Sequence, residues 1–297
     1  MIIFDGYALA KTKEAELLQR TYQLSQQGKV PHVTAILFQE DAGSVLYSRL
    51  KQETADRIGI EYELHTFSLK DSIEKIIFAI EKANQNPDVT GIIIQKPMRR
   101  TWESARLSNQ MVDYASWWHE LTSHIAESKD VDGLHPSTLE SIKNNTWKSQ
   151  GRVLPATCKA VLSILEFSAP QLQISNYQLL KTAIIGKSDL LGYPLFYELK
   201  NRGNTQVELF GRKELQHRID AGKGLKDFQI IVSATGVTNL ITGTLLTDHS
   251  ILIDVGEPQP DIDRESVSLK ADFLTPVPGG VGPMTIVSLL ENALELC

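Results

Sequence analysis

The chain has 297 residues, of which 42% are apolar and 22% charged, and its 30 Lys and Arg against 36 Asp and Glu give a net charge of −6. These ordinary globular proportions exclude a disordered chain, a collagen and a small disulfide scaffold. The acidic balance argues against general nucleic-acid binding, because a phosphate backbone repels it. It still permits one basic pocket for a phosphorylated cofactor.

The two cysteines are Cys158 and the last residue, Cys297, so a structural disulfide is not expected, and neither belongs to a metal-binding pattern. This usage is typical of the reducing cytoplasm. The first residues lack the basic start and long apolar run of a signal peptide. No apolar stretch approaches the roughly 18 residues of a membrane helix. We therefore expect a cytoplasmic protein without a membrane or nucleic-acid partner and without a bound metal.

Short apolar runs alternate with amphipathic stretches in the first half of the chain. The pattern predicts strands over 33–39, 61–67 and 89–95, helices over 44–58, 72–83 and 111–125, and a loop over 129–136. Strands and helices in alternation are typical of a parallel sheet covered by helices.

The alternation restarts after a linking helix predicted over 155–167. The pattern predicts strands over 181–186, 205–211, 228–236 and 250–257, and helices over 194–202, 213–221 and 285–296. The fold class expected is therefore α/β, with two lobes and a ligand cleft between them.

A turn that contains glycine follows the strand predicted at 181–186. Gly186 ends this strand, Gly192 lies six residues further on, and Pro194 suits the first turn of a helix. Glycine lets the backbone approach a pyrophosphate, and the helix N-terminus presents free N–H groups to it. We expect this turn, with Lys187 and Ser188, to bind a dinucleotide in a Rossmann-like lobe. Because Gly-x-Gly-x-x-Gly is absent, a strand–turn–helix that binds nothing is the alternative.

The choice of cofactor is read at the end of the next strand, where an acidic residue would hold the ribose hydroxyl groups of NAD. Glu208 falls too early for this role, whereas Arg212 stands at the strand end and can pair with the 2′-phosphate of NADP, helped by Lys187. NADP is therefore expected, with NAD as the alternative, unless Arg212 is merely solvated. Thr235 and Gly236 complete the candidate cofactor site.

A helix in the first lobe places Ser44, Tyr47 and Lys51 on one face, at positions i, i+3 and i+7. A lysine that transfers protons must be partly desolvated, so that its pKa falls toward neutrality. Gln95 ends a predicted strand, and ligands bind at the carboxyl ends of strands in such sheets. The alternatives are a surface helix with stray polar side chains and a glutamine that only caps its strand.

The loop at 129–136 carries two carboxylates that can reach the same site. These are Asp130 and Asp132, and a turn held together by its own side chains is the alternative interpretation. His135 is expected to belong to the loop structure rather than to act as a base.

These motifs occur in a fixed order that resembles one known family. Ser-x-x-Tyr-x-x-x-Lys, Gln-x-Pro, Lys-Asp-Val-Asp-Gly and Gly-x-Ser-x-x-x-Gly-x-Pro are followed by Thr-Pro-Val-Pro-Gly-Gly-Val-Gly-Pro-Met-Thr. The chain resembles the bifunctional methylenetetrahydrofolate dehydrogenase/methenyltetrahydrofolate cyclohydrolase family over its whole length. The string at 275–285 is the most specific part of the resemblance.

The resemblance implies an NADP-dependent oxidation of methylenetetrahydrofolate to the methenyl cation, followed by hydrolysis to formyltetrahydrofolate. It also implies a folate-binding catalytic domain at 1–150 plus 276–297 and an NAD(P)-binding Rossmann domain at 151–275. The C-terminal helix is expected to return to the first lobe, and a homodimer is the usual assembly of the family.

The resemblance also implies roles for single residues. Lys51 matches the catalytic lysine, and Gln95 matches the glutamine that hydrogen-bonds it. Tyr47 matches the tyrosine that packs on the folate, and Asp132 matches the aspartate that binds the pterin. Further candidates for substrate binding are Ser44, Pro278 and Gly279.

Two alternatives to this function remain open. The chain could be a related dehydrogenase for an amino acid or a shikimate-like acid, because residues 96–128 depart from the family pattern. It could also be an inactive paralogue that binds folate or a partner, with the aromatic segment 114–118 as an interaction surface. An amphipathic helix packed on the first lobe is the simpler interpretation of that segment.

Overall fold

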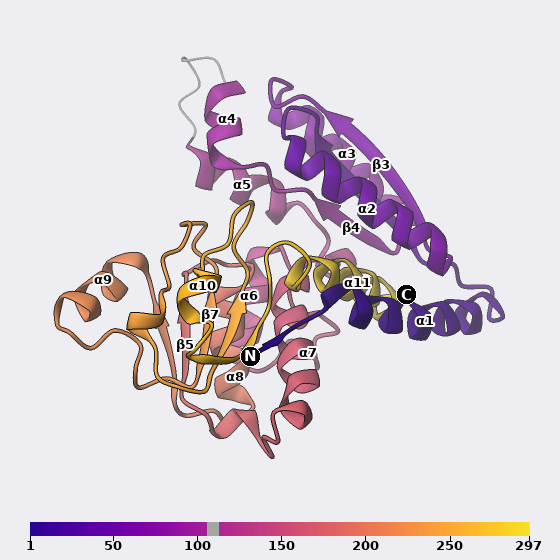
Figure 1. The fold of residues 1–297 in the computed structure, drawn as a ribbon. Helices are drawn as coiled ribbons and strands as arrows, with labels where there is room; N and C mark the ends of the chain where they lie inside the picture. Colours follow the sequence, from indigo (N-terminus) through magenta and orange to yellow (C-terminus); the bar gives the residue numbers. More distant parts are fainter. Residues whose placement is uncertain (106–112) are drawn as a thin grey trace. The chain divides into compact units, whose positions relative to one another are not determined.

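In this computed structural model, which describes residues 1–105 and 113–297, the chain forms two compact units (Figure 1). One unit comprises Met1–Thr12 and Pro155–Ser288, and the other comprises Lys13–Leu154 and Leu289–Cys297. Helices α1 (Gly6–Ser25) and α11 (Val281–Glu295) contribute residues to both units. The expected two-domain α/β class is confirmed.

The unit that contains residues 155–288 is built on a six-stranded parallel sheet with the order β1-β9-β8-β7-β5-β6. The strands are β1 (Ile2–Ile3), β5 (Thr182–Ile185), β6 (Val207–Phe210), β7 (Ile230–Ser233), β8 (Ser250–Asp254) and β9 (Ala271–Leu274). The four strands predicted in this part of the chain are confirmed. The pattern missed β1, which has two residues, and β9, in which Asp272 interrupts the apolar run.

In the same unit, one helix precedes β5 and three connect consecutive strands of the sheet. They are α7 (Ala156–Gln171), α8 (Gly192–Asn201), α9 (Arg212–Asp220) and α10 (Arg264–Val267), with single 3-10 turns at Tyr177–Leu179 and Gly243–Leu245. β5, β7 and β8 are buried along their whole length, as expected for parallel strands covered on both faces.

The strand order reverses at β5, which has β6 on one side and β7 on the other. In open α/β sheets, ligands bind beyond the carboxyl ends of the strands at such a switch point. Gly186 follows β5 and Ala234 follows β7, so both lie at this point. The topology therefore places the predicted glycine turn where a dinucleotide binds in this class of sheet.

The other unit contains a three-stranded parallel sheet with the order β3-β2-β4. Its strands are β2 (His32–Phe38), β3 (Glu61–Phe67) and β4 (Gly91–Ile94). Its helices are α2 (Ala42–Ile58), α3 (Ile73–Gln85), α4 (Arg99–Ala105), α5 (Tyr114–Ser123) and α6 (Pro136–Lys143), with a 3-10 turn at Glu127–Lys129. Of the helix predicted over 111–125, residues 111 and 112 lie outside the described residues.

Local sequence explains both ends of α2, the helix that carries three candidate site residues. Asp41 caps its N-terminus, because the carboxylate accepts a hydrogen bond from the Ser44 N–H at 3.2 Å. Gly59 ends it in the left-handed region, with φ of 77°. Lys51 lies in the middle of the helix and among its buried residues.

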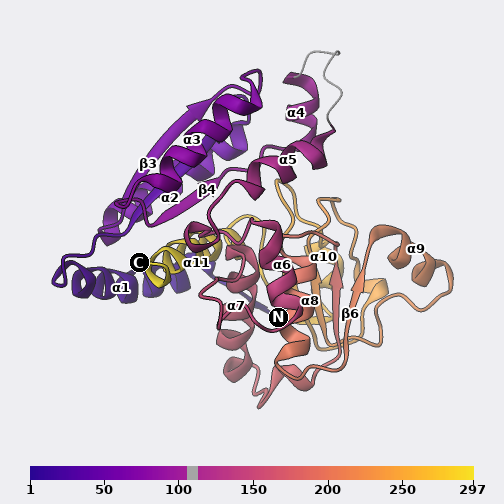
Figure 2. The ribbon, with the colours of Figure 1, turned by 180° about the vertical axis from the view of Figure 1, so that it is seen from behind.

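The last residues of α11 belong to the unit that contains Lys13–Leu154, as the resemblance implied. The buried Asn292 side chain donates hydrogen bonds to the carbonyl oxygens of Val131 at 2.9 Å and Leu154 at 2.8 Å. Arg20 of α1 contacts Glu291 of α11 at 3.4 Å, and Figure 2 shows these two helices side by side. The chain end is thereby attached to the loop that precedes α6.

The aromatic segment at 114–118 lies in α5. The Trp117 ring is buried and packs on Phe38 of β2, with centroids 5.3 Å apart, and on Trp102 of α4, at 5.7 Å. Lys96 Nζ lies 4.9 Å from the centroid of the Trp118 ring. These contacts agree with the simpler interpretation, an amphipathic helix that packs on its own unit.

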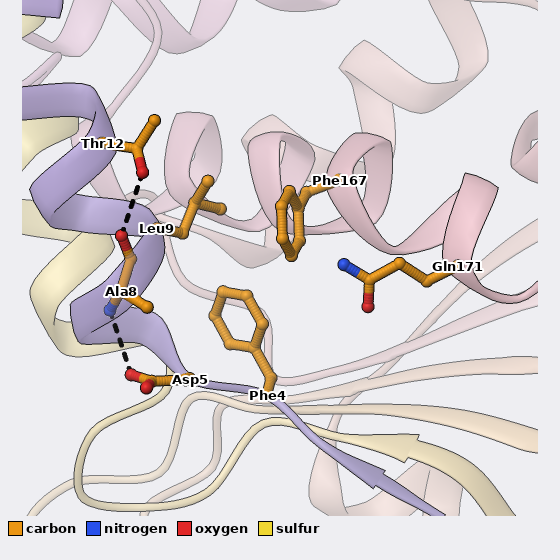
Figure 3. A pocket seen from close by; sticks show the side chains of 7 residues that line it. All are labelled: Phe4, Asp5, Ala8, Leu9, Thr12, Phe167 and Gln171. Carbon is orange, nitrogen blue, oxygen red and sulfur yellow. Dashed lines mark hydrogen bonds between the residues drawn. The ribbon is translucent and has the colours of Figure 1, made fainter.

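A groove of about 320 Å³ lies between the start of α1 and the end of α7 (Figure 3). The rings of Phe4 and Phe167 stand edge to face in it, with centroids 5.9 Å apart. None of the candidate site residues lines this groove, which is formed by Phe4, Asp5, Ala8, Leu9, Thr12, Phe167 and Gln171.

Candidate active site

Lys51 and Gln95 form a buried polar pair. Lys51 is 7% exposed and Gln95 5% exposed, and Lys51 Nζ donates a hydrogen bond to Gln95 Oε1 at 3.0 Å. Gln95 directly follows β4, and its N–H donates to the Ile36 carbonyl oxygen at 2.8 Å, which continues the strand pairing. The structure therefore brings together the lysine and the glutamine, which lie 44 residues apart in the sequence.

Ser44 holds the end of β4 against the start of α2. Its hydroxyl group donates to Asp41 Oδ2 at 2.6 Å and lies 3.3 Å from the Lys96 carbonyl oxygen. Tyr47 is half-buried on the same helix. Ser44 thus shapes the backbone beside Gln95 through contacts that the spacing of the motif did not indicate.

The two carboxylates of the loop differ in environment. Asp130 is buried and accepts hydrogen bonds from the N–H groups of Leu134 and His135, both at 2.8 Å, and from Thr138 Oγ1 at 3.1 Å. Burial raises its pKa, and these hydrogen bonds oppose the rise. The turn interpretation therefore holds for Asp130, whereas Asp132 is half-buried.

Lys129 fixes the other end of this loop. Its ammonium group donates to three carbonyl oxygens at the end of α3: Ala83 at 3.2 Å, Asn84 at 2.8 Å and Asn86 at 2.7 Å. A cation at a helix C-terminus satisfies carbonyl groups that lack partners within the helix. Together with Asn292, it holds the backbone on both sides of Asp130.

His135 acts as the N-cap of α6. Its Nδ1 accepts a hydrogen bond from the Ser137 N–H at 3.2 Å, and burial lowers its pKa although the neighbouring Glu127 opposes this. This position agrees with a structural histidine of the loop.

Tyr62 is a residue of this site that the sequence analysis missed. It is 7% exposed, at the second position of β3. Burial and the charge of Asp132 raise the pKa of its phenol, and the Gln95 side chain partly opposes this. Tyr62 belongs to a strand predicted over 61–67, and a strand prediction alone does not say which distant side chains lie near its ring.

Glycine is required at both ends of the turn in the other unit. Gly186 has φ of +119°, and a Cβ there would lie 2.4 Å from the Ala234 carbonyl oxygen. A Cβ on Gly192 would lie 1.9 Å from the Gly186 carbonyl oxygen. Ser188 Oγ accepts from the Leu191 N–H at 3.2 Å, just before α8 begins. This close strand–turn–helix packing at the switch point fits a dinucleotide.

The two basic residues expected to bind the 2′-phosphate of NADP, Lys187 and Arg212, differ in their surroundings. Lys187 forms an ion pair with Glu214 of α9, whereas Arg212 is exposed at the first position of that helix. The Glu214 carboxylate also packs against Gly211, where a Cβ would lie 2.6 Å from Glu214 Oε2. Glu214, which stands beyond the strand end, belongs to none of the motifs recognised in the sequence.

Thr235, after β7, is held by a buried carboxylate. Asp261 Oδ2 accepts from its N–H at 2.6 Å and its hydroxyl group at 2.8 Å. Asp254, at the end of β8, accepts from the Asp261 N–H at 3.2 Å and the Ile262 N–H at 2.9 Å. Burial raises the pKa of Asp254 to about 6, and the charge of Asp261 adds to the rise.

The C-terminal motif packs its backbone on the start of α1. The Gly6 N–H donates to the Gly279 carbonyl oxygen at 3.0 Å, and a Cβ on Gly6 would lie 1.9 Å from the Gly280 carbonyl oxygen. Gly279 has φ of +96°, and Pro278 beside it is exposed. The glycines therefore allow a close approach within the chain itself.

The described residues, 1–105 and 113–297, hold neither a cluster of metal ligands nor a membrane-spanning helix. No three His, Cys, Asp or Glu side chains gather there as ligands of a metal ion. In the same residues, no helix combines the length and the apolar character needed to cross a membrane. Both cysteines are free thiols.

The switch-point glycine turn in one unit is typical of a two-domain α/β protein that binds a dinucleotide. The other unit contributes a buried Lys–Gln pair. Two family models match the chain. The tetrahydrofolate dehydrogenase/cyclohydrolase catalytic domain matches residues 4–132, and the NAD(P)-binding domain of the same family matches residues 155–297.

Curated and solved proteins give the same result. The bifunctional protein FolD of Limosilactobacillus reuteri is 32% identical over 99% of this chain and 96% of its own length. FolD of Methanococcoides burtonii is 32% identical over 98% of this chain and 95% of its own. The crystal structure of the bifunctional enzyme FolD from Campylobacter jejuni is 27% identical, has a TM-score of 0.84 and covers 100% of this chain and 98% of that one.

The chain belongs to the FolD family of bifunctional tetrahydrofolate dehydrogenase/cyclohydrolase enzymes. Its second domain is an NAD(P)-binding domain.

Proposed function

We propose that this chain catalyses the two consecutive reactions of its family. In the first, the methylene carbon of 5,10-methylenetetrahydrofolate loses a hydride and becomes the 5,10-methenyl cation. In the second, water adds to the cation, the ring opens to 10-formyltetrahydrofolate, and one proton is released. The observation that carries the proposal is the buried Lys51–Gln95 hydrogen bond in the region matched by the catalytic-domain model.

Lys51 is the group that we propose moves a proton in the hydrolytic step. A permanent positive charge beside a carbon that becomes cationic would oppose the oxidation. Burial disfavours the charged form of an amine, and the neutral Gln95 amide orients it without adding a charge. An amine held in this way can accept a proton from the water that adds to the methenyl carbon.

The pterin and its side chain are proposed to bind around this pair. Asp132 would accept hydrogen bonds from the amino and ring N–H groups of the pterin, because it is the half-buried carboxylate of the loop. Tyr47 would pack on the folate, and Ser44 would shape the site through Lys96. Pro278 and Gly279 are proposed as further substrate contacts.

The dinucleotide, when bound, supplies an acceptor for the hydride. Residues at the switch point fit its phosphates and ribose, because the turn packs closely there and α8 begins beside it. The residues proposed to hold it are Gly186, Lys187, Ser188, Gly192, Arg212, Thr235 and Gly236. We propose NADP as the preferred cofactor, since Arg212 is exposed for a 2′-phosphate, with NAD as the alternative.

We further propose that folate binding and catalysis reside in residues 1–150 plus 276–297, and dinucleotide binding in residues 151–275. We propose a cytoplasmic homodimer, because a homodimer is the usual assembly of the family. Exposed apolar side chains such as Leu269, at 94% exposure, are compatible with such an assembly. Light scattering after gel filtration at several concentrations tests the dimer, and a monomer at all of them contradicts it.

The activity is tested by adding 5,10-methylenetetrahydrofolate with NADP or with NAD and following the absorbance of the methenyl product and its decay. Turnover with at least one cofactor, followed by hydrolysis, is the expected result. A parallel panel of amino acids and shikimate-like acids tests the alternative substrates. Absence of turnover with either cofactor contradicts the proposed function.

A further inference from the structure

A buried carboxylate beside the carboxyl ends of β7 and β8 binds three donors through one oxygen atom. Asp261 is fully buried, and its Oδ2 accepts hydrogen bonds from Ser233 Oγ at 2.8 Å, the Thr235 N–H at 2.6 Å and the Thr235 hydroxyl group at 2.8 Å. Its Oδ1 is also buried and makes no hydrogen bond within the described part of the chain. Burial of a carboxylate in this way costs free energy, so its presence here calls for a functional explanation.

Backbone hydrogen bonds on both sides fix the position of Asp261. Its N–H donates to Asp254 Oδ1 at 3.2 Å, and its carbonyl oxygen accepts from the Ile241 N–H at 3.0 Å. Asp254 ends β8 and is the register partner of Ser233, the last residue of β7. The carboxylate is thereby attached to the sheet, and Thr235 is attached to the carboxylate.

Thr235 lies beside the glycine turn. Ala234 precedes it and packs on that turn, because a Cβ on Gly186 would lie 2.4 Å from the Ala234 carbonyl oxygen. β6, which leads to Arg212, lies on one side of β5, and β7 lies on the other side. In this class of sheet, the ribose of the adenosine half binds at the end of the strand that follows the glycine turn. The nicotinamide half therefore extends toward the end of β7, where Thr235 lies.

The contacts of the Thr235 hydroxyl group decide which ligand atoms it can bind. A hydroxyl group has one hydrogen and two lone pairs. Its hydrogen is directed at Asp261 Oδ2, and one lone pair accepts from the Val237 N–H at 3.2 Å. The remaining lone pair can only accept. A phosphate oxygen also accepts and does not fit it, whereas an N–H or O–H group of the ligand does.

We propose that Asp261 is a positioning residue, which holds the Thr235 hydroxyl group as an acceptor for an N–H or O–H group in the nicotinamide half of the bound dinucleotide. Two groups of that half have this chemistry: the carboxamide of the nicotinamide and the hydroxyl groups of its ribose. The proposal rests on the proposed function of this site, because Thr235 is one of the residues proposed to hold the dinucleotide.

Calorimetric titration with NADP and with NAD, in the absence of folate, tests the hydroxyl group. Thr235→Val replaces it by a methyl group, so Kd should rise about tenfold, the factor that one hydrogen bond can contribute. Thr235→Ser keeps a hydroxyl group and should bind with a Kd within about twofold of the wild type. An unchanged Kd in the Thr235→Val variant would overturn the proposal.

Two probes show which part of the ligand is bound. The 3-acetylpyridine analogue of the dinucleotide lacks only the NH2 group of the carboxamide. If the effect of Thr235→Val disappears with this analogue, the donor is the carboxamide, and if it persists, the donor is the ribose. The adenosine fragment, adenosine 2′,5′-bisphosphate for NADP or ADP for NAD, lacks the whole nicotinamide half. An equal rise in Kd for this fragment would mean a general disturbance of the loop and would overturn the proposal.

Asp261→Asn tests the positioning role itself. A neutral amide oxygen binds donors less strongly than a carboxylate does, so Kd for the dinucleotide should rise at least about threefold. Ser233→Ala is the matched control, because it removes a hydrogen bond to the same Oδ2 and leaves both contacts of Thr235 in place. Its Kd should stay within about twofold of the wild type. Equal changes in the two variants would overturn the positioning role.

A double-mutant cycle separates positioning from packing. In a Thr235→Val background, Asp261→Asn should raise Kd less than it does in the wild type, because the hydroxyl group that Asp261 holds is gone. Full additivity of the two substitutions would overturn the proposal. If Asp261→Asn does not fold, the Thr235 variants and the two probes still decide the test, because Thr235 is only half-buried.

None of these measurements requires turnover of the folate. The expected pattern of Kd values together with absence of turnover would contradict only the proposed function. If the wild-type protein bound neither NADP nor NAD, the proposal would be overturned as well.

Discussion

Lys51 illustrates how burial alters the chemistry of one side chain. Lysine is seldom buried in proteins, because the ammonium group loses its hydration. Here it is 7% exposed, and a neutral amide accepts its hydrogen bond. If Lys51 had only a structural role, an apolar residue of similar length would serve equally well. Replacing the amine by such a residue therefore tests its role directly.

Lys51→Met keeps the length and apolar stem of the side chain but removes the amine. We expect the protein to fold and methenyl hydrolysis to fall at least about 100-fold, the contribution typical of a positioned acid or base. The measurement is the decay of the methenyl absorbance. Lys82→Met, at an exposed position of α3 in the same unit, is the control. If the Lys51→Met variant hydrolysed the methenyl compound at the wild-type rate, Lys51 would have no part in the mechanism.

The raised pKa of Asp254 predicts that the free energy of unfolding depends on pH. Its pKa is about 6 in the folded protein against an ordinary value of 3.8, so the native state holds the proton more tightly than the unfolded state does. The contribution of Asp254 to the free energy of unfolding is therefore complete below about pH 4 and is lost as pH rises through about 6. The shift of roughly two units corresponds to at most about 3 kcal/mol.

Urea unfolding at about pH 4.5 and about pH 7 measures this effect in the wild type and in Asp254→Asn. The variant cannot ionise at this position, so its free energy of unfolding should fall less between the two pH values than that of the wild type. Asp272→Asn, a more exposed position on the neighbouring strand, is the control. Parallel pH curves for the Asp254 variant and the wild type would contradict the prediction.

At the scale of elements, α11 positions the loop of the proposed folate site. Asn292 on this helix binds the carbonyl oxygens of two residues that are 161 and 138 positions away in the sequence. Val131, one of the two, precedes Asp132. The C-terminal helix therefore contributes to the site through the backbone of the loop.

Asn292→Leu should lower the free energy of unfolding by about 2–4 kcal/mol, because it leaves two buried carbonyl groups without partners. It should also weaken folate binding, since the loop that carries Asp132 loses an anchor. Chemical denaturation and folate titration measure the two effects. Glu291→Gln, which alters a half-buried contact of the same helix, should cost less than about 1 kcal/mol. Equal losses in the two variants would show that Asn292 has no special role.

The contact between α9 and the glycine turn predicts an effect on cofactor choice. The Glu214 carboxylate pairs with Lys187, and its negative charge would repel a 2′-phosphate. Glu214→Gln should therefore lower the KM for NADP several-fold while the KM for NAD changes little.

Initial-rate kinetics with both cofactors measure this difference. Glu208→Gln is the matched control, because it removes a carboxylate that pairs with Lys181 in the same unit and changes the net charge equally. The same change in KM for both cofactors, or the same effect in the control, would contradict a specific role of Glu214.

At the scale of the whole molecule, two helices are expected to couple the unfolding of the two units. α1 and α11 each contribute residues to both units, so melting either helix removes packing from both. We therefore expect a single cooperative unfolding transition rather than two.

Tryptophan fluorescence tests this expectation, because all four tryptophans lie in the unit that contains residues 13–154. Circular dichroism reports helices of both units. The two midpoints should coincide, and NADP at about 100 times its Kd should raise both, since it adds about 2.7 kcal/mol to the folded state. A fluorescence midpoint that does not respond to the dinucleotide would show that the units unfold separately.

Much of the architecture could be predicted from local patterns. The predicted alternation of strands and helices holds for β2–β8, because apolar runs and turn-forming residues act over a few positions. β1 and β9 could not be predicted, since short strands gain their stability from pairing with distant neighbours. The helix α6 was not predicted, although Pro136 and its His135 cap mark its start.

The sequence by itself determined the chemistry available to this protein: glycines where a tight turn is needed, a lysine on a helix face, and a glutamine at a strand end. These features depend only on residues a few positions apart, so they can be recognised in the sequence alone. Only the tertiary structure decided that Lys129 binds the carbonyl groups at the end of α3, that Asn292 anchors the loop of Asp132, and that Glu214 pairs with Lys187. The physical reason is that burial removes water as a partner, so each polar group depends on whichever distant group the fold brings within reach.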